Sequence, residues 1–131
     1  MSDKTPGIGQ KRPVGDDDLG ILLKKLRDFD DNVRIDAAKR LGNYPRPQVV
    51  KALIGRLIDR SSQVRWYVID TLVKINDKSV CESITEKLED EVAEIRGKAA
   101  EALGILGCKD AAMALVNAVD DGNEDVTKFV G

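Results

Sequence analysis

The sequence predicts an all-α fold, a right-handed α-solenoid made of stacked antiparallel helix pairs. Two observations carry this prediction: a repeat with a period of 31 residues, and apolar side chains at helical spacing within each repeat. Self-similarity at a fixed period of this size is typical of solenoids. We expect three full repeats at about 18–48, 49–79 and 80–110 and a partial fourth at 111–131, which together form one domain over 16–131.

The repeat is visible as columns of similar residues with no insertions between them. Each full repeat carries a Val-Arg or Ile-Arg pair, an aspartate before it and a leucine after it. These columns are Val33-Arg34, Val64-Arg65 and Ile95-Arg96; Asp28, Asp59 and Asp90; and Leu41, Leu72 and Leu103. The series continues with Asp121, but Thr127 stands where the fourth arginine would be.

Each repeat is expected to contain two helices. In the second repeat, apolar residues at 53, 54, 57 and 58 form the stripe of a first helix, and those at 64, 68, 69 and 72 form that of a second. Ser62 is the expected N-cap of this second helix. The second helices are expected to end at Pro45 and Pro47, at Asn76-Asp77 and at Gly107.

Residues 1–15 do not join the pattern. They contain Pro6, Gly7, Gly9, Pro13 and Gly15 and little apolar mass, so we expect a disordered N-terminal tail. The first helix is expected after the acidic run 16–18.

Composition excludes several classes of function. The chain of 131 residues has no histidine, which removes Ser-His-Asp and Cys-His catalysis and imidazole metal sites. We therefore expect no catalytic residue, no metal and no cofactor. A net charge of −2 does not favour nucleic acid, and no apolar run is long enough for a membrane span. Cys81, expected in the core, and Cys108, expected in a loop, suggest no disulfide framework, which suits a cytoplasmic protein.

The columns resemble HEAT repeats, specifically the short repeats of phycobilisome lyase subunits and of many bacterial and archaeal scaffold proteins. The resemblance lies in residues 30–42, read as Asp-Asp-Asn-Val-Arg-Ile-Asp-Ala-Ala-Lys-Arg-Leu-Gly, and again in 92–104. It covers about residues 16–131 and implies the solenoid fold. It says little about function, because one fold hosts many roles.

The regular series of aspartates and arginines is interpreted as structural. Stacking brings equivalent positions together, so these side chains are expected to form a ladder of charge-assisted hydrogen bonds through the turns. The predicted ladder comprises Asp28, Arg34, Asp59, Arg65, Asp90 and Arg96.

One predicted surface has the features of a protein-binding site. Trp66 and Tyr67 follow the Val-Arg pair of the second repeat, at positions that the core pattern does not need. The resemblance implies that second helices line a concave face, where these aromatic residues would anchor a bound protein or peptide. Alternatively, the indole packs locally in the space left at Gly97. The other residues predicted on this face are Lys39, Asp70, Lys98 and Glu101.

The function predicted from the sequence is a non-catalytic scaffold or adaptor that binds another protein along its concave face. The alternative, implied by the resemblance, is a HEAT-like subunit of a heteromeric phycobilin lyase or isomerase. Residues 1–76 carry 15 basic and 10 acidic side chains, against 6 and 13 in 77–131. We interpret this as a drift of surface composition, and the alternative is a bipolar rod that orients a partner or a second copy. Its C-terminal edge, with Val126 and Phe129, is expected to join a second copy or a longer solenoid.

Overall fold

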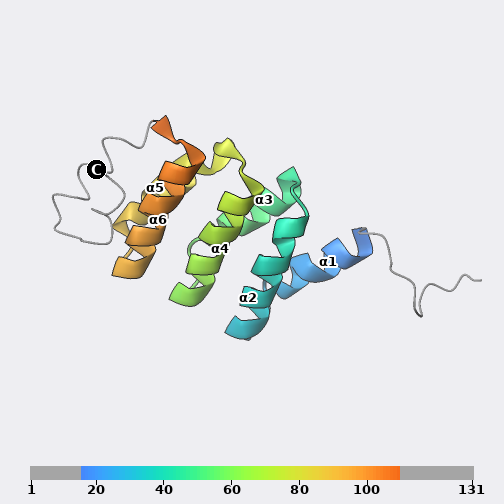
Figure 1. Cartoon of the computed structure of the whole chain (residues 1–131). Coiled ribbons are helices and arrows are strands. Elements are labelled where there is room, and N and C mark those ends of the chain that lie inside the picture. Colours follow the sequence, from blue (N-terminus) through green and yellow to red (C-terminus); the bar gives the residue numbers. More distant parts are fainter. Residues whose placement is uncertain (1–15, 110–131) are drawn as a thin grey trace, which may run out of the picture.

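The computed structural model describes residues 16–109, and these form a stack of helices (Figure 1). No strand occurs within this range. The helices are α1 (Asp16–Lys25), α2 (Asp31–Arg40), α3 (Pro47–Gly55), α4 (Ser62–Ile75), α5 (Cys81–Thr85) and α6 (Ala93–Leu106). Short 3-10 helices lie at Leu41–Asn43, Lys78–Val80 and Glu86–Glu89. The predicted N-terminal tail and the partial fourth repeat lie outside the described residues.

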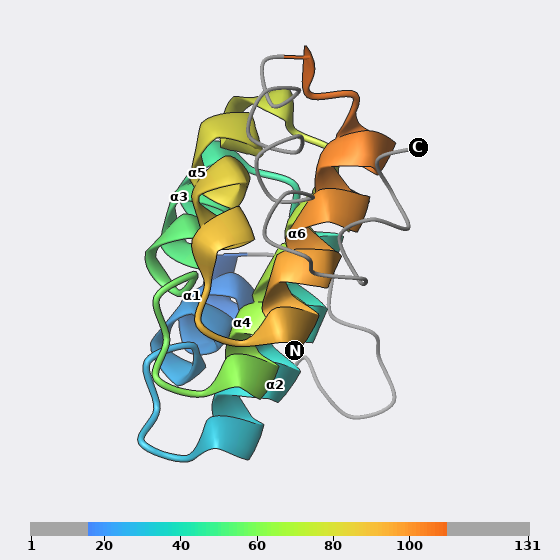
Figure 2. The same ribbon diagram turned by 90° about the vertical axis from the view of Figure 1, so that its left-hand side faces the viewer.

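The helices form two layers (Figure 2). One layer contains α1, α3 and α5, and the other contains α2, α4 and α6. The central helix α4 packs against both α2 and α6, so each repeat contacts its neighbour along a whole helix. This arrangement confirms the predicted α-solenoid, in which stability comes from nearest-neighbour interfaces.

The core lies between the layers and is built from the repeating columns. Leu41, Leu72 and Leu103 are all fully buried, one from each repeat. Alanines occupy several other buried positions, among them Ala37 and Ala99, and their small side chains let adjacent helices approach closely. The predicted apolar columns therefore form one continuous core.

The helix ends follow the local sequence. The side chain of Ser61 accepts a hydrogen bond from the main-chain N of Val64, so Ser61 is the N-cap of α4 and the expectation of Ser62 is wrong by one residue. Asn76 and Gly107 end α4 and α6 in the left-handed conformation, as predicted. Pro47 is the first residue of α3, where its missing N–H costs no helix bond.

Two expectations about the first helices are wrong. The acidic run 16–18 lies inside α1 as its first turn, where negative charge is favourable, and not before it. Ile58 was expected in the apolar stripe but is 82% exposed. The reason is that α3 ends at Gly55, so helical spacing no longer applies to the turn that follows.

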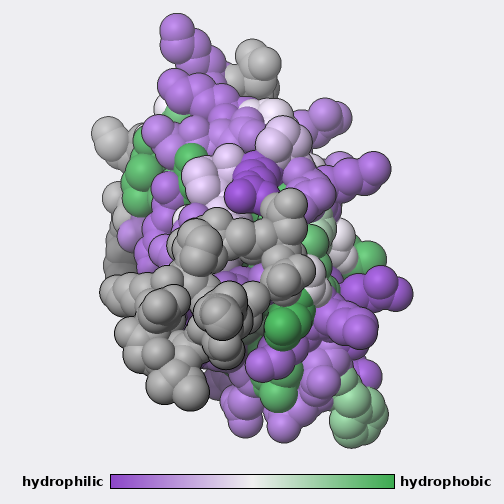
Figure 3. Space-filling view, turned by 90° about the vertical axis from the view of Figure 1, so that its right-hand side faces the viewer, coloured by the Kyte–Doolittle hydropathy of each residue, from purple (hydrophilic) through white to green (hydrophobic). Residues whose placement is uncertain are grey.

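The outer face of the first repeat is less buried than the equivalent positions of the next two repeats. Leu22 is only partly buried, whereas Leu53 and Ile84, the equivalent residues of the next repeats, are fully buried. Ile21 on the same helix is exposed. Figure 3 looks onto this end, where hydrophobic side chains in green lie among hydrophilic ones in purple.

The two cysteines form a disulfide, which the sequence analysis did not predict. Cys81 and Cys108 have Cα atoms 5.6 Å apart and join the start of α5 to the residue after the Gly107 cap. Both side chains are partly buried. A separation of 27 residues gave no signal of pairing, because the contact depends on how α6 folds back along α5. The expectation of a reducing compartment rested on unpaired cysteines, so this disulfide removes that support.

Reduction of this disulfide should lower the free energy of unfolding by about 3 kcal/mol, the value for a closed loop of this size. Chemical denaturation with and without a thiol reductant would measure the change. A variant with both Cys81→Ser and Cys108→Ser is the control, since a reductant should not alter its stability. Equal stability of the oxidised and reduced wild-type protein would contradict the prediction.

Candidate functional site

The turns between the helices of each repeat hold the Asp and Arg series. Arg34 donates from Nε and Nη2 to the two carboxylate oxygens of Asp59, each at 2.9 Å. Its Nη1 donates to the main-chain oxygens of Asp28 at 2.7 Å and Phe29 at 3.0 Å. The arginine of the first repeat thus closes its own turn through main-chain bonds and reaches the aspartate of the second repeat.

The second repeat builds the same connection to the third. Arg65 Nη1 donates to the main-chain oxygen of Asp59 at 2.7 Å, and Nη2 donates to Asp90 Oδ1 at 3.0 Å. Arg65 Nε lies 2.9 Å from Asp90 Oδ2 but without the alignment of a hydrogen bond. Lys87 adds an ion pair to the same carboxylate at 3.1 Å.

Burial and hydrogen bonding oppose each other at the two buried aspartates. Burial acts to raise the pKa of Asp59, but hydrogen bonds from Arg34, Ser61 and Arg56 outweigh it and lower the pKa below its ordinary value. Burial also acts to raise the pKa of Asp90, and bonds from Val92, Arg65 and Lys87 again lower it. Both carboxylates are therefore held in the charged form.

The ends of the series differ from its middle. Asp28 is exposed, and its carboxylate accepts a bond from the main-chain N of Asp30. Arg96 donates to the main-chain oxygen of Asp90 at 2.7 Å. Asp121, the next aspartate in the series, lies outside the described residues. The geometry gives these charges a role in joining repeats, since the connecting carboxylates are shielded from solvent.

The two aromatic residues lie together on α4. The rings of Trp66 and Tyr67 make an edge-to-face contact with centroids 5.0 Å apart. Lys98 Nζ lies 3.9 Å from the centroid of the Trp66 ring, and Lys39 Nζ lies 5.3 Å from that of Tyr67. Trp66 is half-buried and packs against the core, so local packing accounts for part of its position.

The charged residues predicted on this face are also brought together. Lys98 Nζ donates to Asp70 Oδ1 at 2.9 Å and to Glu101 Oε1 at 3.2 Å. The bond to Asp70 joins α6 to α4, the bond to Glu101 lies within α6, and the ammonium group that they hold lies over the indole. The face formed by α2, α4 and α6, which we call the second-helix face, therefore carries an aromatic pair flanked by charges of both signs.

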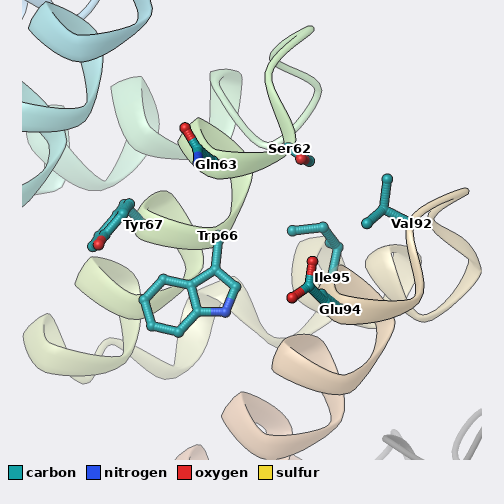
Figure 4. A pocket seen from close by; sticks show the side chains of 7 residues that line it. All are labelled: Ser62, Gln63, Trp66, Tyr67, Val92, Glu94 and Ile95. Carbon is teal, nitrogen blue, oxygen red and sulfur yellow. The ribbon is translucent and has the colours of Figure 1, made fainter.

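A pocket of about 250 Å³ opens beside the indole (Figure 4). Its lining residues are Ser62, Gln63, Trp66, Tyr67, Val92, Glu94 and Ile95. Sequence reasoning named only the two aromatic residues. The repeat register held a signal for the rest: Ser62 and Gln63 lie one helical turn before Trp66, and Glu94 is the equivalent of Gln63 in the third repeat.

We also searched the described residues for a metal site and for a membrane-spanning helix. Residues 16–109 contain no group of three or more acidic or cysteine side chains arranged to hold a metal ion. No helix in the described region is long and apolar enough to cross a membrane.

The stacked helix pairs and their inter-repeat bonds define a helical-repeat protein. The family of HEAT repeats matches residues 19–92 and 56–130, and the chain belongs to this family. A HEAT repeat-containing taxis protein of Halobacterium salinarum is 32% identical over 119 residues, covering 75% of this chain. The chain spans only 29% of that relative.

Solved structures share the fold. The complex of CpcE and CpcF of phycocyanin lyase from Nostoc matches with a TM-score of 0.72 and 24% identity, covering 92% of this chain and 47% of the matched one. An engineered protein matches with a TM-score of 0.61 and 17% identity, covering 86% of this chain and 59% of its own. At these identities the likeness concerns architecture alone.

Proposed function

We propose that this protein is a non-catalytic interaction scaffold that binds another protein or a peptide on its second-helix face. The observation that carries the proposal is the aromatic pair Trp66 and Tyr67, half-buried on α4 beside an open pocket. Trp and Tyr dominate the residues that contribute most to protein interfaces. A half-buried indole that is already held in place loses little conformational freedom on binding.

The charges of the face support a protein partner over a nucleic acid. Lys98 pairs with Asp70 and Glu101, and Lys39 lies over the Tyr67 ring, so positive and negative groups alternate on the described part of this face. A nucleic-acid groove needs one sign of charge along its length. A folded protein or peptide that carries both signs fits this surface better.

Site-specific crosslinking would test where a partner binds. Benzoylphenylalanine would replace Tyr67 in one variant, and Lys51, exposed on α3 in the other layer, in the matched control. Irradiation in cells that naturally produce the protein should yield a defined crosslinked partner for position 67 and none for position 51. A product only from position 51 would contradict the proposed face.

Trp66→Ala should then weaken binding of the purified partner by about 2 kcal/mol or more, the range of aromatic anchors. Isothermal titration calorimetry would measure the affinity, and thermal unfolding would show that the variant remains folded. Unchanged affinity in a folded Trp66→Ala variant would assign the indole to local packing alone.

The structural similarity to the phycocyanin lyase complex is the reason to retain one alternative function. In that case the chain would serve as a HEAT-like subunit of a heteromeric phycobilin lyase or isomerase. Incubation with a bilin separates the two functions, because a scaffold leaves the absorbance spectrum of the pigment unchanged. A spectral shift that requires this chain would favour the lyase-type subunit.

A further inference from the structure

The pocket beside Trp66 has two chemically different walls. The α4 wall offers the hydroxyl of Ser62, the amide of Gln63 and the indole of Trp66 (Figure 4). The α6 wall offers the side chains of Ile95 and Glu94. A volume of about 250 Å³ is below the roughly 300–1,000 Å³ of pockets that enclose drug-sized ligands, so it suits a single side chain.

The acidic group of this pocket, Glu94, has no cationic partner within the described part of the chain. Glu94 is exposed and makes no ion pair with any residue from 16 to 109. Lys98, one turn further along α6, directs its ammonium group to Asp70 and Glu101 instead. Glu91, which precedes the lining residue Val92 in the sequence, is a second exposed carboxylate without an ion pair in this range. The carboxylate of Glu94 therefore has no compensating cation among the residues that the structure describes.

The indole adds a second attraction for a cation. An aromatic face attracts ammonium and guanidinium groups, and Trp is the strongest of the three aromatic residues in this respect. The ammonium group of Lys98 already lies 3.9 Å from the ring centroid of Trp66, which shows that the ring takes part in such contacts. The part of the indole that borders the pocket is available for another.

We propose that this pocket binds an arginine side chain of the partner, an inference that rests on the proposed function. The guanidinium group would stack on the part of the Trp66 ring face that borders the pocket and pair with the carboxylate of Glu94. Its five N–H donors would also reach the oxygens of Gln63 and Ser62, which the compact ammonium group of lysine cannot do at once. The methylene groups of the arginine would contact Ile95 and Val92.

Short peptides test the inference without knowledge of the partner. The probes are acetyl-Leu-Arg-Leu-amide, the same peptide with lysine, and the same peptide with citrulline, which keeps the shape of arginine but is neutral. Trp66 is the only tryptophan of the chain, so its fluorescence reports on the pocket directly. The arginine peptide should give a saturable change, and the citrulline peptide should bind about tenfold more weakly.

Glu94→Gln should weaken the arginine peptide about tenfold and leave the citrulline peptide unchanged. Glu86→Gln, which removes an exposed carboxylate from a 3-10 helix of the other layer, is the matched control and should change neither affinity. Equal binding of the arginine peptide to both variants, or of the arginine peptide and either other peptide to wild type, would overturn the inference. The proposed function would survive that result if the crosslinked partner still depends on Trp66.

Discussion

Asp59→Ala should lower the free energy of unfolding by about 3–5 kcal/mol, the cost of removing one partner from a buried ion pair. The Asp59 side chain has no exposed surface, and Arg34 beside it is almost as inaccessible. The substitution removes both acceptors of the Arg34 guanidinium in the second repeat and leaves this buried cation with the half-exposed carboxylate of Asp31 and two main-chain oxygens. It also removes the acceptor for the main-chain N of Ser61, the N-cap of α4. Chemical denaturation would measure the loss.

Asp28→Ala is the matched control, since Asp28 is the equivalent residue of the first repeat. Its carboxylate is exposed and accepts a bond from the main-chain N of Asp30, so we expect a loss below about 1 kcal/mol. Equal losses of unfolding free energy for the two variants would mean that the bonds between repeats contribute no stability beyond that of the local turn.

The same pair of variants should differ in their response to acid. The pKa of Asp59 is lowered in the folded protein, so its contribution is present above the ordinary value of 3.8 and is lost as pH falls through the lower folded value. Wild type and Asp28→Ala should therefore lose stability below about pH 4 more steeply than Asp59→Ala. A residual slope is expected from Asp90, whose pKa is also lowered.

The fold could be predicted because its determinants are local and periodic. The leucine columns at 41, 72 and 103 fix the core, and their constant period fixes the way in which repeats stack. The turn chemistry of Asn76 and Gly107 is equally local, since each ends a helix by its own backbone conformation. Such signals do not depend on knowing the three-dimensional arrangement.

Features that depend on contacts between repeats were only partly predictable. The spacing of Asp and Arg indicated a ladder, but not that Arg34 passes over its own aspartate to reach Asp59. The Cys81–Cys108 pair depends on the geometry of α5 and α6 and left no mark in the spacing. The acidic wall of the pocket was not predicted for a similar reason: Glu94 belongs to the third repeat and Trp66 to the second, and they line one pocket only because the two repeats stack.

Leu72→Ala should cost about 2–5 kcal/mol of unfolding free energy, the range for a large side chain removed from a packed core. Leu72 is fully buried on α4, the helix that packs against both neighbours. The cavity would lie in the continuous core beneath α4, where surrounding side chains are already closely packed. Denaturation with urea would give the value, and an unchanged slope of the transition would show that the native state keeps its compactness.

Ile58→Ala provides the comparison, because it removes a similar aliphatic side chain from the same repeat. Ile58 is 82% exposed, so we expect a change within about 0.5 kcal/mol. Trp66→Ala should fall between these two variants, since the indole is half-buried and packs against the core on one side only. A loss at Trp66 as large as that at Leu72 would place the indole among the core residues. A loss near that of Ile58 would show that the fold does not need the indole and would leave partner binding as the reason for its position.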